Sequence, residues 1–196
     1  MPLMSDVRRL VLAPVLAVLA LVVAGAGGLA SSPAQAQAIY SGALDGATVN
    51  PPTPSTATGA TEVTVDVDQL LVDISFSGLT GGTTASHIHC CATPPANAGV
   101  AITYPSFPAG VTSGVYANTF DLASTGTYQA AFLTANGGTA AGAKAALLSG
   151  MEDGRAYACV HTTIFPGSEI RSFLRFESFA DGFESADTLD WSASVL

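Results

Sequence analysis

Basic residues are scarce in this 196-residue chain, which contains only six lysines and arginines against 15 acidic residues. The leading segment described below contains Asp6, Arg8 and Arg9, so the remainder carries 14 acidic and four basic side chains, a formal charge of −10. These four cations are scattered along the chain: Lys144, Arg155, Arg171 and Arg175. Because they form no basic stripe, we expect neither nucleic acid nor an anionic membrane surface as a partner.

Catalytic signatures are also missing. The serines occur in no Gly-x-Ser-x-Gly elbow, and the chain has no phosphate-binding loop and no Gly-x-Gly-x-x-Gly turn. The sequence therefore predicts no catalytic residue, and we expect a protein that is not an enzyme.

One long apolar run, Leu10 to Val23, directly follows Arg8 and Arg9. The run fades through Gly and Ala into Ala-Gln-Ala-Gln-Ala at 34–38, which offers two small-x-small cleavage frames. Pro14 and the absence of a positive flank beyond the run argue against a transmembrane anchor. Residues 1–38 are therefore predicted to be a signal peptide. We expect a secreted or periplasmic protein with an unknown ligand in that compartment and no stable membrane anchor after cleavage.

The mature chain has the periodicity of strands. Residues 62–68 and 72–77 alternate strictly between apolar and polar around a turn at Asp68-Gln69, which predicts an antiparallel hairpin. Further strands are expected in five places: 39–44, 87–91, 100–104, 155–163 and 169–176. The last two are predicted to form a closing hairpin around the Pro-Gly turn at 165–168.

The middle of the chain changes character. Residues 127–135 and 139–149 are rich in Ala and Leu, with Thr139 as a predicted N-cap, and indicate two short helices inserted in a β scaffold. The whole pattern predicts an all-β fold, an antiparallel Greek-key sandwich or barrel of immunoglobulin-like or superoxide-dismutase-like type.

All histidines and cysteines of the chain lie in two short segments. The first contains His87, His89, Cys90 and Cys91, and the second contains Cys159 and His161. Side chains two apart share a face of a strand, so we expect His87, His89 and Cys91 on one side, and Cys159 with His161 likewise. Two hypotheses follow for this cluster. The histidines are structural and hold two strands in register, or His87, His89 and His161 bind copper or zinc in a secreted protein, with redox or hydrolytic activity as an extension of this second hypothesis.

Export also bears on the cysteines, because thiols tend to be oxidised outside the cytoplasm. Three cysteines allow one disulfide. Bridging Cys90 to Cys91 requires a strained eight-membered ring, so a Cys91–Cys159 bridge is the easier prediction if the two strands are adjacent. Free cysteines are the alternative.

Several motifs together resemble the chordin-type domain known as CHRD. They are His-Ile-His at 87–89, Tyr-Ala-Cys-Val-His-Thr at 157–162 and Phe-Pro-Gly-Ser-Glu-Ile-Arg at 165–171. In the family pattern a His-Ile-His strand is followed much later by Tyr-x-x-x-His-Thr, a Pro-Gly turn and Gly-Glu-Ile-Arg-Gly. The resemblance covers roughly residues 39–174. Ser168 and Ser172 stand where the family has Gly, and Cys159 stands where Asn is expected.

The resemblance implies an exported β-sandwich module with no established catalytic activity, here a secreted bacterial single-domain member. In animal chordin such domains are repeated in an extracellular protein that binds growth factors. The resemblance also assigns structural roles to the matching positions Tyr157, Thr162, Pro166, Gly167, Glu169 and Arg171. Glu169 and Arg171 are expected to share a strand face, where they could form an ion pair. The predicted organisation is a signal peptide at 1–38, a CHRD-like domain at 39–175 and an acidic tail at 176–196.

Overall fold

A computed structural model of the protein describes residues 37–177. The predicted signal peptide and acidic tail lie outside the described residues, except for residues 37, 38, 176 and 177. Within the described range, no helix is both long enough and apolar enough to cross a bilayer.

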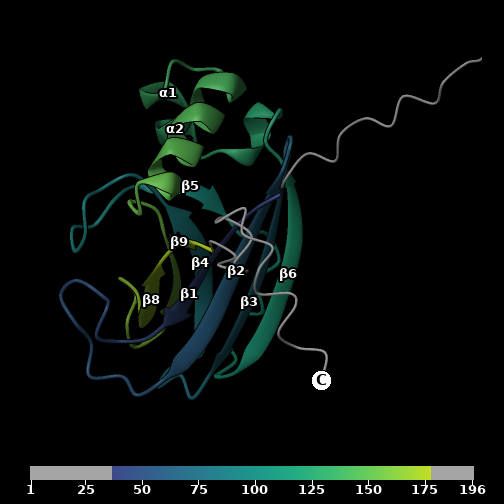
Figure 1. Ribbon diagram of the computed structural model, residues 1–196. Coiled ribbons are helices and arrows are strands. Elements are labelled where there is room, and N and C mark those ends of the chain that lie inside the picture. Colours follow the sequence, from purple (N-terminus) through teal and green to yellow (C-terminus); the bar gives the residue numbers. More distant parts are fainter. Residues whose placement is uncertain (1–36, 178–196) are drawn as a thin grey trace, which may run out of the picture. The chain divides into compact units, whose positions relative to one another are not determined.

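Two antiparallel sheets pack together as an all-β sandwich (Figure 1). The five-stranded sheet has the order β6-β3-β2-β1-β9. Its strands are β1 (Ala38–Leu44), β2 (Thr58–Asp66), β3 (Gln69–Ser77), β6 (Gly114–Asp121) and β9 (Arg175–Phe176). The four-stranded sheet has the order β5-β4-β7-β8. Its strands are β4 (Thr83–His89), β5 (Val100–Thr103), β7 (Tyr157–Thr162) and β8 (Ile170–Phe173).

The predicted all-β sandwich is confirmed, with differences in detail. The turn between β2 and β3 lies at Val67-Asp68, one residue earlier than expected, and Val67 adopts a φ of 53° there. β6 was not predicted, although Tyr116 and Phe120 alternate with exposed neighbours along it. The chain after β8 crosses to the other sheet, where β9 pairs with β1, so only β7 and β8 form the closing hairpin.

Alternation along the strands separates the core from the outer faces. In β3 the residues Leu70, Val72, Ile74 and Phe76 are buried and those between them are exposed. In the four-stranded sheet the core receives Ile88 from β4 and Ala158 and Val160 from β7, among others. The residues that alternate with these along β4 and β7 include all three histidines and Cys159. They therefore face away from the sandwich core.

The predicted helical insertion lies between β6 and β7. It consists of a short 3₁₀ turn η1 (Thr125–Thr127) and two helices, α1 (Ala130–Ala135) and α2 (Ala140–Glu152). Thr139 caps α2 as expected, because its Oγ1 accepts a hydrogen bond from the Gly142 N–H at 3.1 Å. Leu147 and Met151 are fully buried in the main core, which anchors α2 to the sandwich.

A buried carboxylate joins loops at one end of the sandwich. Glu169, which is 0% exposed, lies in a bend just before β8. Its Oε1 accepts hydrogen bonds from Ser55 Oγ (2.7 Å) and the Thr80 N–H (2.6 Å), and its Oε2 accepts them from Thr162 Oγ1 (2.7 Å) and the Gly81 N–H (3.4 Å). Burial alone raises the pKa of this carboxyl, but the hydrogen bonds to its charged form outweigh burial and hold the pKa below the ordinary value.

A Glu169→Gln variant is expected to lower the free energy of unfolding at neutral pH by about 1.5–3 kcal/mol, the range for hydrogen bonds to a charged group. Since the pKa in the folded state is lowered, the stabilisation is present above the ordinary carboxyl value of 4.5 and is lost as pH falls through the folded-state pKa. Denaturant unfolding at several pH values should show the gap between wild type and variant narrowing in acid. Glu62→Gln, at an exposed position on β2, is the matched control and should change little. A gap that stays constant down to the acid transition would contradict this account.

Candidate metal centre

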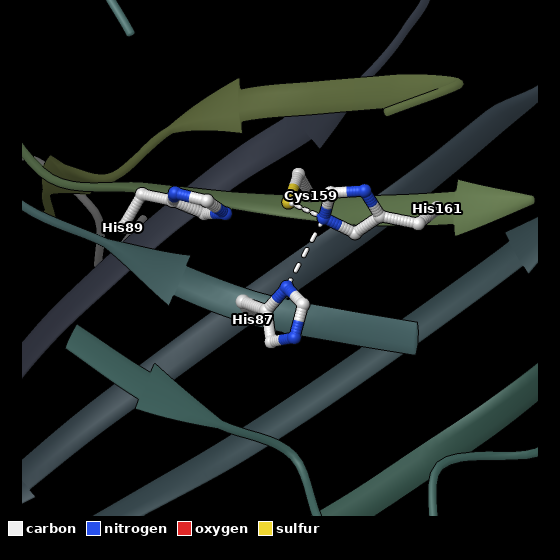
Figure 2. Close-up of side chains that lie close together, drawn as sticks. All are labelled: His87, His89, Cys159 and His161. Carbon is white, nitrogen blue, oxygen red and sulfur yellow. Dashed lines mark hydrogen bonds between the residues drawn. The ribbon is translucent and has the colours of Figure 1, made fainter. Parts of the chain in front are cut away.

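Three histidines and one cysteine come together on the outward faces of β4 and β7 (Figure 2). The antiparallel register places His87 opposite Cys159 and His89 opposite Tyr157, and His161 follows Cys159 on the same face. One donor atom from each of His87, His89, Cys159 and His161 lies within 4.8 Å of the corresponding atoms of the other three. His87 and His89 thus share a face of β4, and Cys159 and His161 share a face of β7, as the alternation predicts. The pairing of β4 with β7 then brings the two pairs together.

Backbone carbonyls fix the orientation of two imidazole rings. His161 Nδ1 lies 2.8 Å from the Pro166 carbonyl oxygen, and His89 Nδ1 lies 2.8 Å from that of Ala98. A carbonyl only accepts hydrogen bonds, so these contacts assign the proton to Nδ1 in both rings and leave each Nε2 as an unprotonated acceptor with one lone pair. The same arrangement orients histidines that bind metals.

The Nε2 lone pairs of His161 and His89 have different surroundings. His161 Nε2 lies 3.1 Å from His87 Nδ1 and 3.1 Å from Cys159 Sγ, so its one lone pair can accept a hydrogen bond from either group (Figure 2). His89 Nε2 is buried and has no hydrogen-bond partner. An unsatisfied buried polar atom in a native protein is uncommon, and an unrecorded ion or water is among its ordinary explanations.

A pocket of about 210 Å³ adjoins this cluster. His89, Tyr157, Cys159 and Arg171 are among its lining residues. The Tyr157 ring stacks on that of His89 with centroids 4.8 Å apart and an interplanar angle of 6°. Ala98 fixes Tyr157 in turn, because its N–H donates to the tyrosine hydroxyl at 3.0 Å.

The surroundings favour the neutral forms of all four donors. Burial and, to a smaller extent, the neighbouring His161 and His89 together lower the pKa of His87 to about 4. Burial also lowers the pKa values of His89 and His161, although their carbonyl partners act in the opposite direction. The Cys159 thiol is 1% exposed, and burial raises its pKa to about 12.

The expected Cys91–Cys159 bridge is wrong. Cys90 and Cys91 form a disulfide with each other, and Cys159 is free. The reason is that β4 ends at His89, one residue before the cysteine pair, so Cys91 no longer follows the strand alternation that would place it beside Cys159. Cys90 instead packs in the main hydrophobic core, and the partly buried Cys91 packs against that core.

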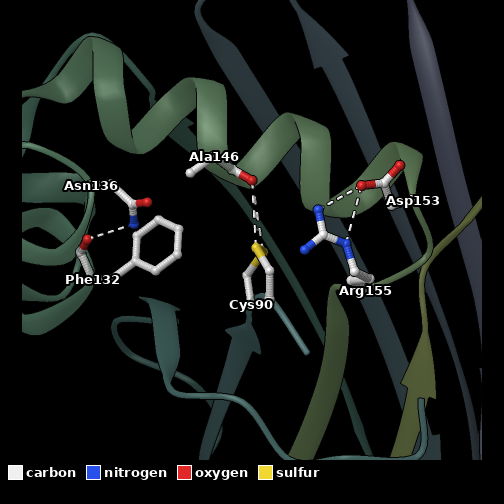
Figure 3. Close-up of a disulfide and its surroundings, with 7 residues drawn as sticks. Cys90, Phe132, Asn136, Ala146, Asp153 and Arg155 are labelled. Carbon is white, nitrogen blue, oxygen red and sulfur yellow. Dashed lines mark hydrogen bonds and ion pairs between the residues drawn. A yellow bond between two sulfur atoms is a disulfide. The ribbon is translucent and has the colours of Figure 1, made fainter. Parts of the chain in front are cut away.

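Helix α2 covers this disulfide (Figure 3). The sulfurs of Cys90 and Cys91 lie 3.9 Å and 3.5 Å from the Ala146 carbonyl oxygen on α2. Gly150, one turn further along, is where the helix comes closest, because a Cβ there would overlap both sulfur atoms. The glycine in this helix is therefore explained by close packing.

The expected pairing of Glu169 with Arg171 is also wrong. Both side chains are fully buried, but they point to different parts of the domain. Glu169 accepts a hydrogen bond from Thr162, which lies on the same side of β7 as the core residues Ala158 and Val160. Arg171 lies opposite Cys159 on the outer face of the sheet. The bend at Glu169 breaks the alternation before β8 begins and accounts for the difference.

The remaining positions singled out from the sequence have clear contacts. Thr162 Oγ1 accepts a hydrogen bond from the Phe165 N–H at 3.1 Å, which shapes the turn, and Pro166 supplies the carbonyl to His161. Gly167 borders the pocket beside Ser168, whose φ of 150° lies in a region that favours glycine. This backbone conformation gives a physical reason for the glycine that the resemblance expects at position 168.

Two functional features escaped the sequence reasoning. The metal hypothesis drawn from the sequence names the three histidines and omits Cys159, although its spacing from His161 places it on the same face. The burial of Arg171 at 1% exposure carried no signal in the sequence, because loop packing produces it.

These observations define the class of the protein: a two-sheet antiparallel sandwich with a His/Cys cluster on the outer face of one sheet. A family model described as the CHRD domain matches residues 40–174, well over half of the chain. The chain therefore belongs to the CHRD domain family. At the family level, this membership supports a non-catalytic module of extracellular type. A search of the curated proteins and a search of the solved structures found no match.

Helix propensity and packing predict opposite effects of a Gly150→Ala substitution on the free energy of unfolding. Propensity alone predicts a gain of up to about 1 kcal/mol for replacing a helical glycine by alanine. Because the new methyl group would overlap the sulfurs of Cys90 and Cys91, we expect instead a loss of about 1–3 kcal/mol, typical of overpacking. Thermal or denaturant unfolding shows whether the substitution raises or lowers the free energy of unfolding. Gly99→Ala is the control, because a Cβ there meets nothing within 4 Å. A stabilised Gly150→Ala protein would show that α2 does not press on the cysteine pair.

Proposed function

We propose that the chain is an exported, non-catalytic CHRD module that binds a single transition metal ion, copper or zinc, through His87, His89, Cys159 and His161. The observation that carries this proposal is the convergence of the four donor atoms within 4.8 Å of one another. The apolar run after Arg8 and Arg9 supports export to the periplasm or the exterior.

The donor set suits such an ion. Imidazole nitrogen and cysteine sulfur are the ligands that zinc and copper prefer in proteins. Four-coordinate binding with bonds of about 2.0–2.3 Å places donor atoms roughly 3.3–3.7 Å apart. The widest pairs in the cluster would therefore close by about one ångström. Side-chain rotation on two paired strands can supply a movement of this size.

The surrounding hydrogen bonds support the same function. The Pro166 and Ala98 carbonyls hold His161 and His89 with Nε2 available to a metal. Binding would give the buried His89 Nε2 the partner that it lacks. The three histidines would bind as neutral rings, and the thiol would bind as thiolate after losing its proton to solvent.

A structural role is the competing function. The contact between His87 and His161 links β4 to β7 without any ion, and the bond from His161 to Pro166 secures the turn after β7. In that case the histidines would contribute stability only through these hydrogen bonds, each worth about 1 kcal/mol. The experiment below distinguishes the two functions.

Zn²⁺ or Cu⁺ added under anaerobic conditions to chelator-stripped protein is expected to raise its melting temperature. An ion at 100 times its dissociation constant stabilises the folded state by about 2.7 kcal/mol. For a domain of this size that stabilisation corresponds to a shift of roughly 5–15 °C. The shift should vanish in His89→Ala and His161→Ala.

Tyr157→Phe is the matched control. It removes a hydroxyl that bonds to Ala98 beside the cluster but leaves all four donor atoms in place, so its metal-dependent shift should persist. A wild-type protein that melts at the same temperature with and without both ions would exclude the metal site. A loss of stability in the metal-free histidine variants would then support the structural role.

A further inference from the structure

Arg171 is a buried cation without an anionic partner among residues 37–177. Its side chain is 1% exposed and forms no salt bridge there. The guanidinium donates instead to neutral groups: to the Thr48 carbonyl through Nε (2.8 Å) and Nη2, to the Pro95 carbonyl (3.1 Å) and to Asn97 Oδ1 (2.9 Å). Neutral acceptors satisfy its N–H groups but leave its positive charge in place.

Arg171 belongs to the same row of residues across the sheet as two of the four donors. Arg171 on β8 is directly opposite Cys159 on β7, which is directly opposite His87 on β4. Directly opposed residues on one sheet face have Cβ atoms about 4.5–5.5 Å apart. The guanidinium carbon lies 4.7 Å from the Tyr157 ring centroid, and the same ring stacks on His89. Arg171, Cys159 and His89 also line the same pocket.

We propose that Arg171 makes this centre selective for a monovalent soft ion, Cu⁺, over Zn²⁺ and other divalent ions. The inference rests on the proposed metal function and adds to it the charge of the ion. It requires no redox step, because it concerns only which ion is bound.

The argument is a comparison of charge in the loaded centre. Cys159 is the only one of the four donors that binds as an anion, so a Cu⁺ centre is neutral and a divalent centre carries one positive charge. The carbonyls of Ala98 and Pro166, which orient two of the rings, are neutral and cannot offset that charge. A divalent centre is therefore repelled by Arg171, and a Cu⁺ centre is not.

Softness and charge can be separated experimentally. Thiolate and imidazole ligands by themselves favour soft ions. Ag⁺ and Cd²⁺ are both soft but differ in charge. An electrostatic effect of Arg171 must act on Zn²⁺ and Cd²⁺ alike and leave Cu⁺ and Ag⁺ nearly unaffected.

Asn97→Asp is the decisive variant, because it sets a carboxylate against Arg171 Nη1 in place of the amide oxygen at 2.9 Å and keeps the hydrogen bond. Dissociation constants for the four ions are measured by anaerobic chelator competition on the purified protein. Neutralising Arg171 in this way should tighten the binding of divalent relative to monovalent ions by roughly 15-fold, as expected for one unit charge about 10 Å away at an effective dielectric constant of about 20. Gln69→Glu is the control, since it adds the same charge at an exposed position on β3 of the other sheet.

The possible outcomes are distinct. Arg171→Lys should retain the wild-type selectivity and Arg171→Gln should resemble Asn97→Asp, with circular dichroism used to confirm that each variant folds. A wild-type protein that keeps Zn²⁺ against equimolar Cu⁺, or an Asn97→Asp protein with an unchanged ratio, would overturn the role of Arg171 and leave the metal site intact. Failure of all four ions to bind would overturn the proposed function itself.

Discussion

The antiparallel register between β4 and β7 is the constraint on which the rest of the site depends. It sets His87 opposite Cys159 and His89 opposite Tyr157, and the pairing of β7 with β8 extends the first row to Arg171. A shift of one residue in this pairing would send the histidines into the core and bring Ile88 out to the surface. The core packing of Ile88, Ala158 and Val160 therefore determines the placement of every polar group on the other side.

Much of the fold could be predicted from the sequence because its signals are local. Strict alternation identified β3 and most of β2, and Thr139 marked the start of α2. The shared face of His87 and His89 and that of Cys159 and His161 followed from the same period of two. The juxtaposition of the two pairs also depended on which strands are neighbours, and the family pattern gave no residue-level statement of that.

The rest depends on interactions between distant segments. The bend at Glu169 turns its carboxylate toward groups near residues 55, 80 and 162, and no local pattern encodes that direction. Arg171 is enclosed by carbonyls from residues 48 and 95, which are distant in the sequence. Glu169 and Arg171 have opposite charges and are two residues apart, a spacing that predicts an ion pair. In the structure each side chain instead forms hydrogen bonds with a different set of loops. The fate of Cys91 likewise depends on where β4 ends.

The pairing of Cys90 with Cys91 has a consequence for Cys159. A disulfide between adjacent residues closes almost no length of chain, so the entropic stabilisation usually credited to disulfides is small here. The disulfide instead affects the chemistry of Cys159. With the other two sulfurs bonded to each other beneath α2, the chain offers Cys159 no intramolecular partner for oxidation. If the protein is exported as we propose, its buried thiol can thus persist where exposed thiols are oxidised.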